Sequence, residues 1–315
     1  MNGGSAINLI ALYGTLNKWS VVGVPKMEEE EIGIILDKYR EAGRILAAVR
    51  EGAITKVKEG ALLLEVAEFV EQSTREKGGE PAFPCNISRN EEAAHATPSI
   101  DDETVFGKDL VKIDLGVHVD GYIADSAVTV DLSGEHKELV AAAEAGLNAA
   151  IELIRDGVNT GEVGDAIEQA IRERGYRPVV NLSGHGLAQY NAHTGPTIPN
   201  VRYEHGVLLK ENDVVAIEPF ATDGVGKVEE HGHVEIYSLI KPRPVRVREA
   251  KDLLKEIENY QGLPFAKRWL PRDRLDLALR TLNNAGALRE YPVLREEGGG
   301  LVSQAEHTVI VTKDG

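Results

Sequence analysis

Two aspartates in the middle of the chain lie in a pattern typical of a β-hairpin. Residues 111–119 and 123–132 each alternate between apolar and polar types, and the dipeptide Asp120-Gly121 between them favours a tight two-residue turn. Asp114 lies in the first run and Asp125 in the second. Carboxylates suit divalent cations, so the register of this hairpin decides whether the two side chains can act together.

A two-residue turn predicts that Asp125 lies opposite Gly116, with Asp114 two residues further along the same face. Diagonal neighbours of this kind lie roughly 7–8 Å apart at the backbone, within reach of two shared metal ions about 3.5–4 Å apart. Two such aspartates repel each other unless cations lie between them. The pattern is therefore compatible with a two-metal site. The alternative, common in an arbitrary hairpin, is a solvated Asp125 and an Asp114 that caps a strand end.

Two glutamates elsewhere strengthen the metal hypothesis. Glu218 ends an apolar, strand-like run and precedes Pro219, and Glu306 interrupts the apolar and β-branched run 301–312. Burying either carboxylate would cost several kcal/mol without a cation partner. Taken alone, each would more often be an edge or exposed position.

Two histidines lie in a glycine-rich stretch between residues 181 and 200. His185 stands between two glycines in Ser183-Gly184-His185-Gly186, which lets the backbone bring an imidazole into a cleft, and His193 follows shortly after. The stretch is too polar and glycine-rich for a core element, so we expect it to line a site. Four carboxylates and one histidine, without cysteine, form a hard-donor set that suits two divalent first-row ions.

A second group of ligand-type residues, at His231, His233 and Glu235, lies beside a strand-like run. Side chains in such a position are more often ordinary polar edge residues, and we interpret them that way.

Composition limits the class of protein. The 315 residues are 42% hydrophobic and 27% charged, which is typical of a globular protein and excludes a disordered or coiled-coil chain. Lysine and arginine total 35 against 51 aspartates and glutamates, so a nucleic acid is not the expected partner. The single cysteine, Cys85, excludes a disulfide framework and a thiolate zinc site, and suits a reducing compartment.

The first 26 residues differ from the rest. They carry only Lys18 and Lys26 as charges, whereas Met27 opens a run of glutamates. We expect residues 1–26 to be a poorly ordered N-terminal extension and residues 27–315 to be the functional domain. The apolar stretch 7–16 is shorter than the roughly 20 residues that span a bilayer, and no cationic run precedes it. We therefore expect a cytoplasmic protein with no membrane partner.

Hydrophobic periodicity predicts the elements that position these residues. Helices are expected over residues 28–49, 61–77, 137–155 and 161–174, and strands over 213–220, 233–240 and 301–312, besides the hairpin. Residues 241–298 look like a helical insertion, clearest over 250–260 and 272–285. The segments Val-Lys-Ile-Asp at 111–114 and Val-Ala-Ile-Glu at 215–218 each end a strand run with a carboxylate, which hints at two related half-domains.

Several motifs, in this order and spacing, resemble one known family. They are P-A-F-P-C-N at 81–86, N-E-E-A-A-H-A-T-P at 90–98, the hairpin at 111–125, the stretch 183–195, residues 216–220, and Q-A-E-H-T at 304–308. Together they resemble the methionine aminopeptidases of the pita-bread fold, specifically the type II enzymes of the archaeal kind. The segment N-Y-Q-G-L-P-F-A-K-R-W-L at 259–270 looks like part of the insertion that separates type II from type I.

The resemblance covers almost all of residues 27–315 and implies an α+β pita-bread fold. In that fold two pseudo-twofold-related αβ halves surround an antiparallel sheet, here with a helical insertion subdomain at about 241–298. It also implies that two divalent metal ions, Co, Mn, Fe or Zn, are bound by five residues, Asp114, Asp125, His185, Glu218 and Glu306. Asp125 and Glu306 would bridge the two ions.

The resemblance also implies roles outside the ligand set. Glu218 would accept the proton of the attacking water, His193 would stabilise the developing oxyanion, and His95 would hold the scissile amide or the substrate amine. Phe83 and Phe220 would surround a methionine side chain through thioether–aromatic contacts, unless either is simply core.

The implied activity is removal of the initiator methionine from nascent polypeptides, with a small second residue preferred, by a monomer that works near the ribosome. An Xaa-Pro dipeptidase or aminopeptidase P would use the same five ligands, but those enzymes carry a substantial N-terminal domain. An inactive pita-bread binding protein is the third reading. Such proteins lose ligands, and all five positions are filled here.

Overall fold

The computed structural model describes residues 29–315 and shows an α+β protein. The predicted extension, residues 1–26, lies outside the described residues. The helices are α1 (Glu29–Lys56), α2 (Leu63–Glu76), α3 (Lys137–Ile151), α4 (Thr160–Glu173), α5 (Arg248–Ile257) and α6 (Leu275–Asn284), with 3-10 turns η2 (Glu258–Tyr260) and η3 (Lys267–Trp269). Among the described helices, none is long and apolar enough to cross a membrane.

The strands form four small antiparallel sheets. They are β1 (Glu80–Pro81), β2 (Asn86–Arg89), β3 (Glu92–Ala94), β4 (Leu110–Val119), β5 (Tyr122–Asp131), β6 (Arg177–Pro178), β7 (Ser183–Ala188), β8 (Asn191–Pro199), β9 (Val214–Ile217), β10 (Phe220–Thr222), β11 (Val228–Leu239), β12 (Phe265–Ala266), β13 (Leu288–Glu296), β14 (Val302–Gln304) and β15 (His307–Ile310). The sheet orders are β1-β4-β2 with β5 beside β4, β15-β9-β7-β8, β14-β10-β6 and β12-β11-β13-β3.

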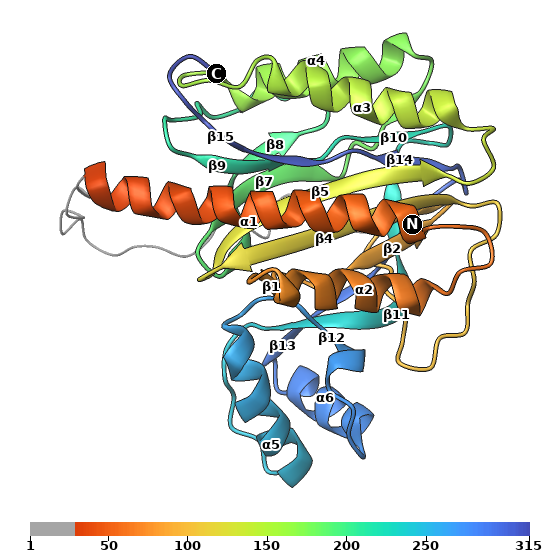
Figure 1. The fold of residues 1–315 in the computed structure, drawn as a ribbon, viewed down its shortest axis with the longest axis vertical. Helices are drawn as coiled ribbons and strands as arrows, with labels where there is room; N and C mark the ends of the chain where they lie inside the picture. The colour runs from red at the N-terminus through yellow and green to blue at the C-terminus, as the bar shows by residue number, and fades with distance from the viewer. Residues whose placement is uncertain (1–28) are drawn as a thin grey trace, which may run out of the picture.

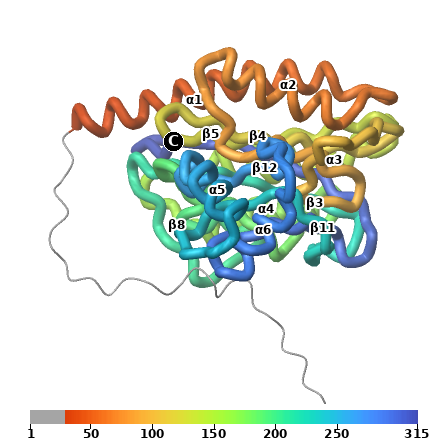
Figure 2. Tube along the Cα trace, turned by 90° about the horizontal axis from the view of Figure 1, so that it is seen from below, coloured from red at the N-terminus to blue at the C-terminus, as the bar shows by residue number. Residues whose placement is uncertain are grey.

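Two helix pairs pack on these sheets in similar ways. The pair α1 and α2 packs on β4, β5 and β2, because α1 presents a continuous apolar face to them. The pair α3 and α4 packs on the strands of the second half, and a separate apolar core forms beneath it. In Figure 1, α3 and α4 lie at the top and α1 crosses the long hairpin β4–β5; Figure 2 shows α1 and α2 together along one edge. The structure thus has the two half-domains that the sequence predicts.

Hydrogen bonds join the halves along β5. The backbone N–H of Asp125 donates to Thr308 Oγ1 at 2.7 Å, and that hydroxyl donates back to Asp125 O at 2.8 Å. The N–H of Glu306 donates to Ala127 O at 3.0 Å. The seam therefore brings two of the predicted ligands, one from each half, to the same place.

The predicted register of the hairpin is confirmed. Asp125 pairs with Gly116, and Asp114 pairs with Ala127, so the two aspartates are diagonal neighbours on one face. Gly121, with a φ of 86°, completes the tight turn.

The interpretation of residues 181–200 was wrong in one respect. This polar, glycine-rich stretch forms β7 and β8, two strands of a four-stranded sheet, and β7 is an inner strand. Glycine is required there because a Cβ on Gly186 would lie 2.0 Å from Gly195 O, and a Cβ on Gly184 would lie 2.3 Å from Ala216 O. This strand is therefore buried through the close approach of neighbouring backbones rather than through apolar side chains.

The insertion also differs from the prediction. Residues 248–257 and 275–284 are helical and, together with Tyr237, Phe265 and Leu288, enclose their own core, but residues 288–296 form strand β13. This strand pairs with β11 along its length, and its other edge pairs with β3. The end of the predicted insertion therefore belongs to a sheet. Figure 1 shows α5 and α6 below β11 and β13.

Candidate metal centre

Asp114 and Asp125 are supplied by the central hairpin. Asp125 is buried, with 4% of its surface exposed, and Asp114 is partly buried. Asn86, on the neighbouring strand β2, pairs with Asp114, and its Nδ2 donates to Asp114 Oδ2 at 3.1 Å. In both aspartates, the carboxylate oxygen Oδ1 is buried and has no hydrogen-bond partner. Each aspartate therefore keeps a free acceptor in a site shielded from bulk water.

Glu218 and Glu306 lie in breaks between short strands rather than inside the continuous strands that the sequence predicts. The breaks separate β9 from β10 and β14 from β15. The flanking ladders, β9 with β15 and β10 with β14, share one antiparallel register, so Glu218 and Glu306 oppose each other within the gap. The Ala305 N–H donates to Pro219 O at 3.2 Å across the same gap. The break frees both residues from the ladder while keeping their carboxylates on one face.

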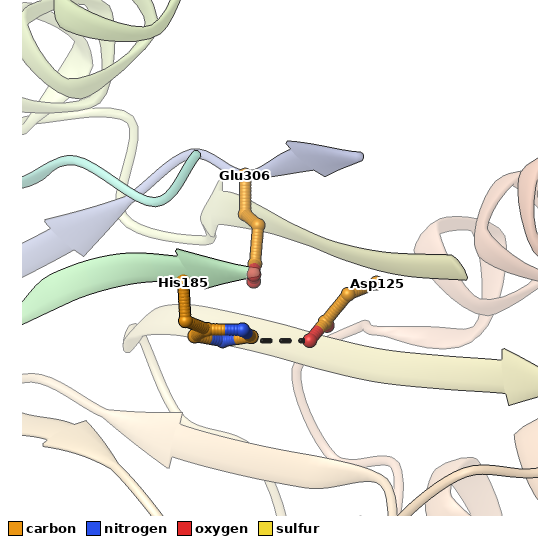
Figure 3. Close-up of side chains that lie close together, drawn as sticks. All are labelled: Asp125, His185 and Glu306. Carbon is orange, nitrogen blue, oxygen red and sulfur yellow. Dashed lines mark ion pairs between the residues drawn. The ribbon is translucent and has the colours of Figure 1, made fainter. Parts of the chain in front are cut away.

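His185 completes the group from strand β7. Its Nε2 lies 3.4 Å from Glu218 Oε1 and 3.9 Å from Asp125 Oδ2. Figure 3 shows the His185 ring and the Asp125 carboxylate directed toward each other, with the Glu306 carboxylate reaching into the same space. Ligand atoms of Asp125, His185 and Glu306 all lie within 4.8 Å of one another. The structure thus brings all five predicted ligand residues into one cluster.

Burial dominates the electrostatics of this cluster, and repulsion between the carboxylates adds to it. Burial raises the pKa of Asp114 to about 6. Burial, reinforced by the neighbouring carboxylates, holds the pKa of Asp125, Glu218 and Glu306 well above the ordinary range. Burial also lowers the pKa of His185 to about 4, so the imidazole is neutral at pH 7 and its short contacts are not ion pairs. Four carboxylates, a neutral imidazole and two free aspartate oxygens fit divalent cations.

The one lysine in the hairpin does not neutralise these carboxylates. Lys112 Nζ donates to Asn90 O at 2.8 Å and so is occupied by the backbone of the β2–β3 turn. The repulsion between the four carboxylates is therefore not relieved by Lys112, and a bound cation would relieve it.

Two supporting residues were missed by sequence reasoning. Asn86 bonds Asp114, and Gln304 Nε2 lies 3.3 Å from Glu306 Oε2 as a donor. Both lie inside the motifs quoted above, next to recognised positions, but an amide next to a motif is ordinary until the strand pairing is known. Such partners fix ligand orientation.

Of the two non-ligand histidines, His193 lies beside the cluster and His95 contacts strand β13. The rings of His193 and His185 have centroids 4.5 Å apart at 55°. His95 Nδ1 lies 3.2 Å from Pro292 O, and its ring meets Tyr291 edge-on at 5.5 Å. Burial lowers the pKa of both His95 and His193, the latter well below its usual range, so both rings are neutral at pH 7.

The two phenylalanines have different environments. Phe83 is partly exposed and its ring packs against Gly116, the partner of Asp125, where a Cβ would lie 2.3 Å from the ring. Phe220 is 1% exposed and belongs to a core cluster with Val179 and Val302. Phe83 therefore has surface that a bound side chain could contact, whereas the contacts of Phe220 are those of a core residue.

The group around His231 and His233 lies on strand β11, which supplies none of the five predicted ligands. Both side chains are exposed on β11, and His233 Nε2 lies 3.6 Å from Glu235 Oε1. The two histidines have the exposed polar character that the sequence favours, but the prediction was wrong for Glu235, which is buried.

Comparison with known sequences places this arrangement in a family. Residues 37–313 match metallopeptidase family M24. The chain belongs to metallopeptidase family M24. The chain is 55% identical over 283 residues to the methionine aminopeptidase of Archaeoglobus fulgidus, and the alignment covers 89% of this chain and 97% of that protein. It is 51% identical over 286 residues to the methionine aminopeptidase of Pyrococcus horikoshii, covering 89% and 97%.

Several solved structures share the fold. A thermophilic Arx1 superposes with a TM-score of 0.80 at 16% identity, covering 91% of this chain and 90% of that one. The methionine aminopeptidase of Thermotoga maritima superposes with a TM-score of 0.67 at 22% identity, covering 92% and 96%. A prolidase from Pyrococcus furiosus covers only 61% of this M24 chain, with a TM-score of 0.54. These likenesses establish the pita-bread fold, and the archaeal sequences place the chain among methionine aminopeptidases.

Proposed function

We propose that this chain removes the initiator methionine from nascent polypeptides, with a small second residue preferred. The observation that carries the proposal is the cluster of four mutually repelling carboxylates and one neutral histidine, which fits divalent cations in a chain of the M24 family. Identity of 55% to a methionine aminopeptidase supports the choice of substrate.

Five residues would hold two divalent ions. They are Asp114, Asp125, His185, Glu218 and Glu306, and we assign the shared positions to Asp125 and Glu306. When bound, such ions lower the pKa of a coordinated water so that hydroxide is available near neutral pH. Carboxylate and imidazole ligands accept cobalt, manganese, iron and zinc alike, so the ion used depends on its availability in the cell.

The remaining roles fall to side chains beside the cluster. Glu218, whose Oε1 lies 3.4 Å from His185 Nε2 within the cluster, would accept the proton of the attacking water and pass it to the leaving amine. His193, neutral and beside His185, would donate to the oxyanion that develops on the scissile carbonyl. His95 would hold the substrate amine or the scissile amide. Phe83 would contact the methionine thioether, and Phe220 would support that wall from the core.

We further propose that residues 27–315 form the catalytic unit, that the protein acts as a cytoplasmic monomer, and that it meets its substrates as they emerge from the ribosome. It needs neither nucleic acid nor membrane for catalysis.

A peptide series tests the proposal against its nearest alternative. Purified protein supplied with Mn²⁺ or Co²⁺ should release methionine from Met-Gly-Met-Met, with rates falling as the second residue grows. An Xaa-Pro dipeptidase would instead cleave Xaa-Pro substrates, and an inactive binding protein would cleave neither. Metal analysis on the same sample should give two ions per chain, and one ion would overturn the two-metal assignment.

A further inference from the structure

A buried ion pair outside the metal centre joins the insertion to helix α2. Arg268, in the 3-10 turn η3, donates through Nη2 to Glu71 Oε1, and both residues are less than 10% exposed. The neighbouring Trp269 donates through Nε1 to Glu71 Oε2 at 2.7 Å. A buried ion pair is weak evidence for stability, because apolar residues of similar volume often serve as well. The question is therefore what this pair positions.

The same pair holds both ends of the segment 85–97, which contains β2 and β3. Arg268 Nη1 donates to Thr97 Oγ1 at 2.7 Å, and Thr97 Oγ1 donates to Cys85 O at 2.7 Å. Cys85 is also held through its backbone nitrogen, because the Cys85 N–H donates to Glu71 Oε1 at 3.2 Å. The insertion and α2 thus fasten the two ends of one segment to each other.

The bonds at Thr97 matter most for His95. Residues of β2 are already held by their ladder with β4, but β3 ends at Ala94, and His95 lies beyond it with a φ of 64°. Left-handed backbone at a non-glycine residue persists only where the surroundings enforce it. Two anchors hold the residues that directly follow His95. The Ile87 N–H donates to Ala96 O at 2.7 Å, and the next residue is held through the Thr97 hydroxyl.

We propose that Thr97, fixed by the Arg268–Glu71 pair, is a positioning residue for His95. The insertion would then set the rate of the reaction by fixing the backbone conformation at His95, although none of Thr97, Arg268 and Glu71 contacts the five ligands. This inference rests on the proposed function, in which His95 contacts the substrate. A misplacement of about 1 Å can lower a rate on the order of 10²-fold, so modest loosening should be measurable.

Thr97→Val tests the proposal because it keeps the volume and removes the hydroxyl. With Met-Gly-Met-Met and Mn²⁺, kcat should fall roughly tenfold or more, while KM and the bound Mn²⁺ change less than about twofold. Thr97→Ser, which keeps the hydroxyl, should restore kcat. Thr74→Val is the matched control, since Thr74 is buried on α2 and its hydroxyl donates to Val70 O within the same helix. Arg272→Met, which breaks the Arg272–Glu256 pair inside the insertion, should also leave kcat unchanged.

A double-mutant cycle separates positioning from general loosening. In a His95→Ala background, Thr97→Val should have no further effect on kcat, because the residue through which it acts is gone. The same fold-loss in both backgrounds would overturn the proposal, as would a loss of Mn²⁺ that accounts for the fall in rate.

Hydrogen exchange distinguishes failure of this inference from failure of the proposed function. The amide of Ile87 should exchange faster in Thr97→Val than in the wild type, with no change in Thr74→Val, because Ala96 O would be less firmly held. If the wild type failed to cleave methionyl peptides, the proposed function would be wrong, and the exchange measurement would still decide whether Thr97 fixes the backbone. Unchanged exchange at Ile87 would overturn the inference whatever the substrate.

Discussion

Glu218 and Glu306 lie directly opposite each other in the gap between two short antiparallel ladders. The N–H of Glu306 turns away from this ladder and donates to Ala127 O, and Ala127 is the strand partner of Asp114. The opposed glutamates of the second half are thereby tied by one hydrogen bond to the diagonal aspartates of the first. Two pairs of carboxylates meet because the two halves share this seam.

Removing a bridging carboxylate should affect both metal ions. Asp125→Ala and Glu306→Ala should abolish activity and weaken binding of both ions, whereas Asp114→Ala should mainly vacate one site. Metal analysis after equal loading, together with the peptide assay, checks this. Two ions at full occupancy in Asp125→Ala would contradict the bridging assignment.

The two adjacent histidines should respond differently to truncation. His193→Ala should lower kcat by on the order of 10²- to 10³-fold, with a smaller effect on KM and no loss of metal, because an oxyanion donor acts mainly in the transition state. His185→Ala should lose metal directly. Kinetics and metal content of both variants, measured after identical loading, check this division. Equal loss of metal from the two variants would show that His193 is a ligand.

Stability of the metal-free protein should depend on pH through Asp114. The pKa of Asp114 is raised to about 6 in the fold, against about 3.9 for an unfolded aspartate. The folded state therefore binds this proton more tightly, and the stabilisation that results is complete below about pH 4 and is lost as the pH rises through 6.

Asp114→Asn cannot titrate and isolates this effect. In EDTA, the Tm of the variant relative to the wild type should rise between pH 5 and pH 8. Saturating Mn²⁺ should reverse the order at pH 8, because the wild type then gains a ligand that asparagine replaces poorly. A Tm difference that stays constant with pH in EDTA would show that Asp114 is not protonated in the fold.

Truncation of the two phenylalanines should have different effects, because Phe83 is proposed to contact the substrate and Phe220 packs in the core. Phe83→Ala should raise KM for methionyl peptides by roughly tenfold, since it removes apolar and thioether contacts of about 1–2 kcal/mol, with little change in Tm. Phe220→Ala should destabilise the fold by about 3–5 kcal/mol, because it opens a cavity in a closed cluster. Denaturant unfolding and steady-state kinetics measure the two effects. A raised KM in Phe220→Ala at temperatures where the variant is fully folded would assign its ring to the substrate wall as well.

The sequence by itself determined the features that depend on neighbouring residues, namely the register of the hairpin and the buried face of α1. The Asp120-Gly121 turn sets the register of the hairpin, and that register alone makes Asp114 and Asp125 diagonal neighbours. The apolar periodicity of α1 likewise suffices to predict its buried face. Residue types and motif order, through the resemblance to one family, were also enough to name five candidate ligands, which the structure places in one cluster.

Only the tertiary structure decided how distant segments meet. Nothing local in residues 288–296 shows that they pair with β11 and β3 rather than continue a helical insertion, because partner strands from about 50 to about 200 positions away compete with local propensity. The glycine-rich strand β7 is buried by close backbone approach, which no hydrophobic pattern records. The opposition of Glu218 and Glu306, and the hold of Arg268 on Thr97, likewise depend on contacts between residues 88 to 171 positions apart in the chain.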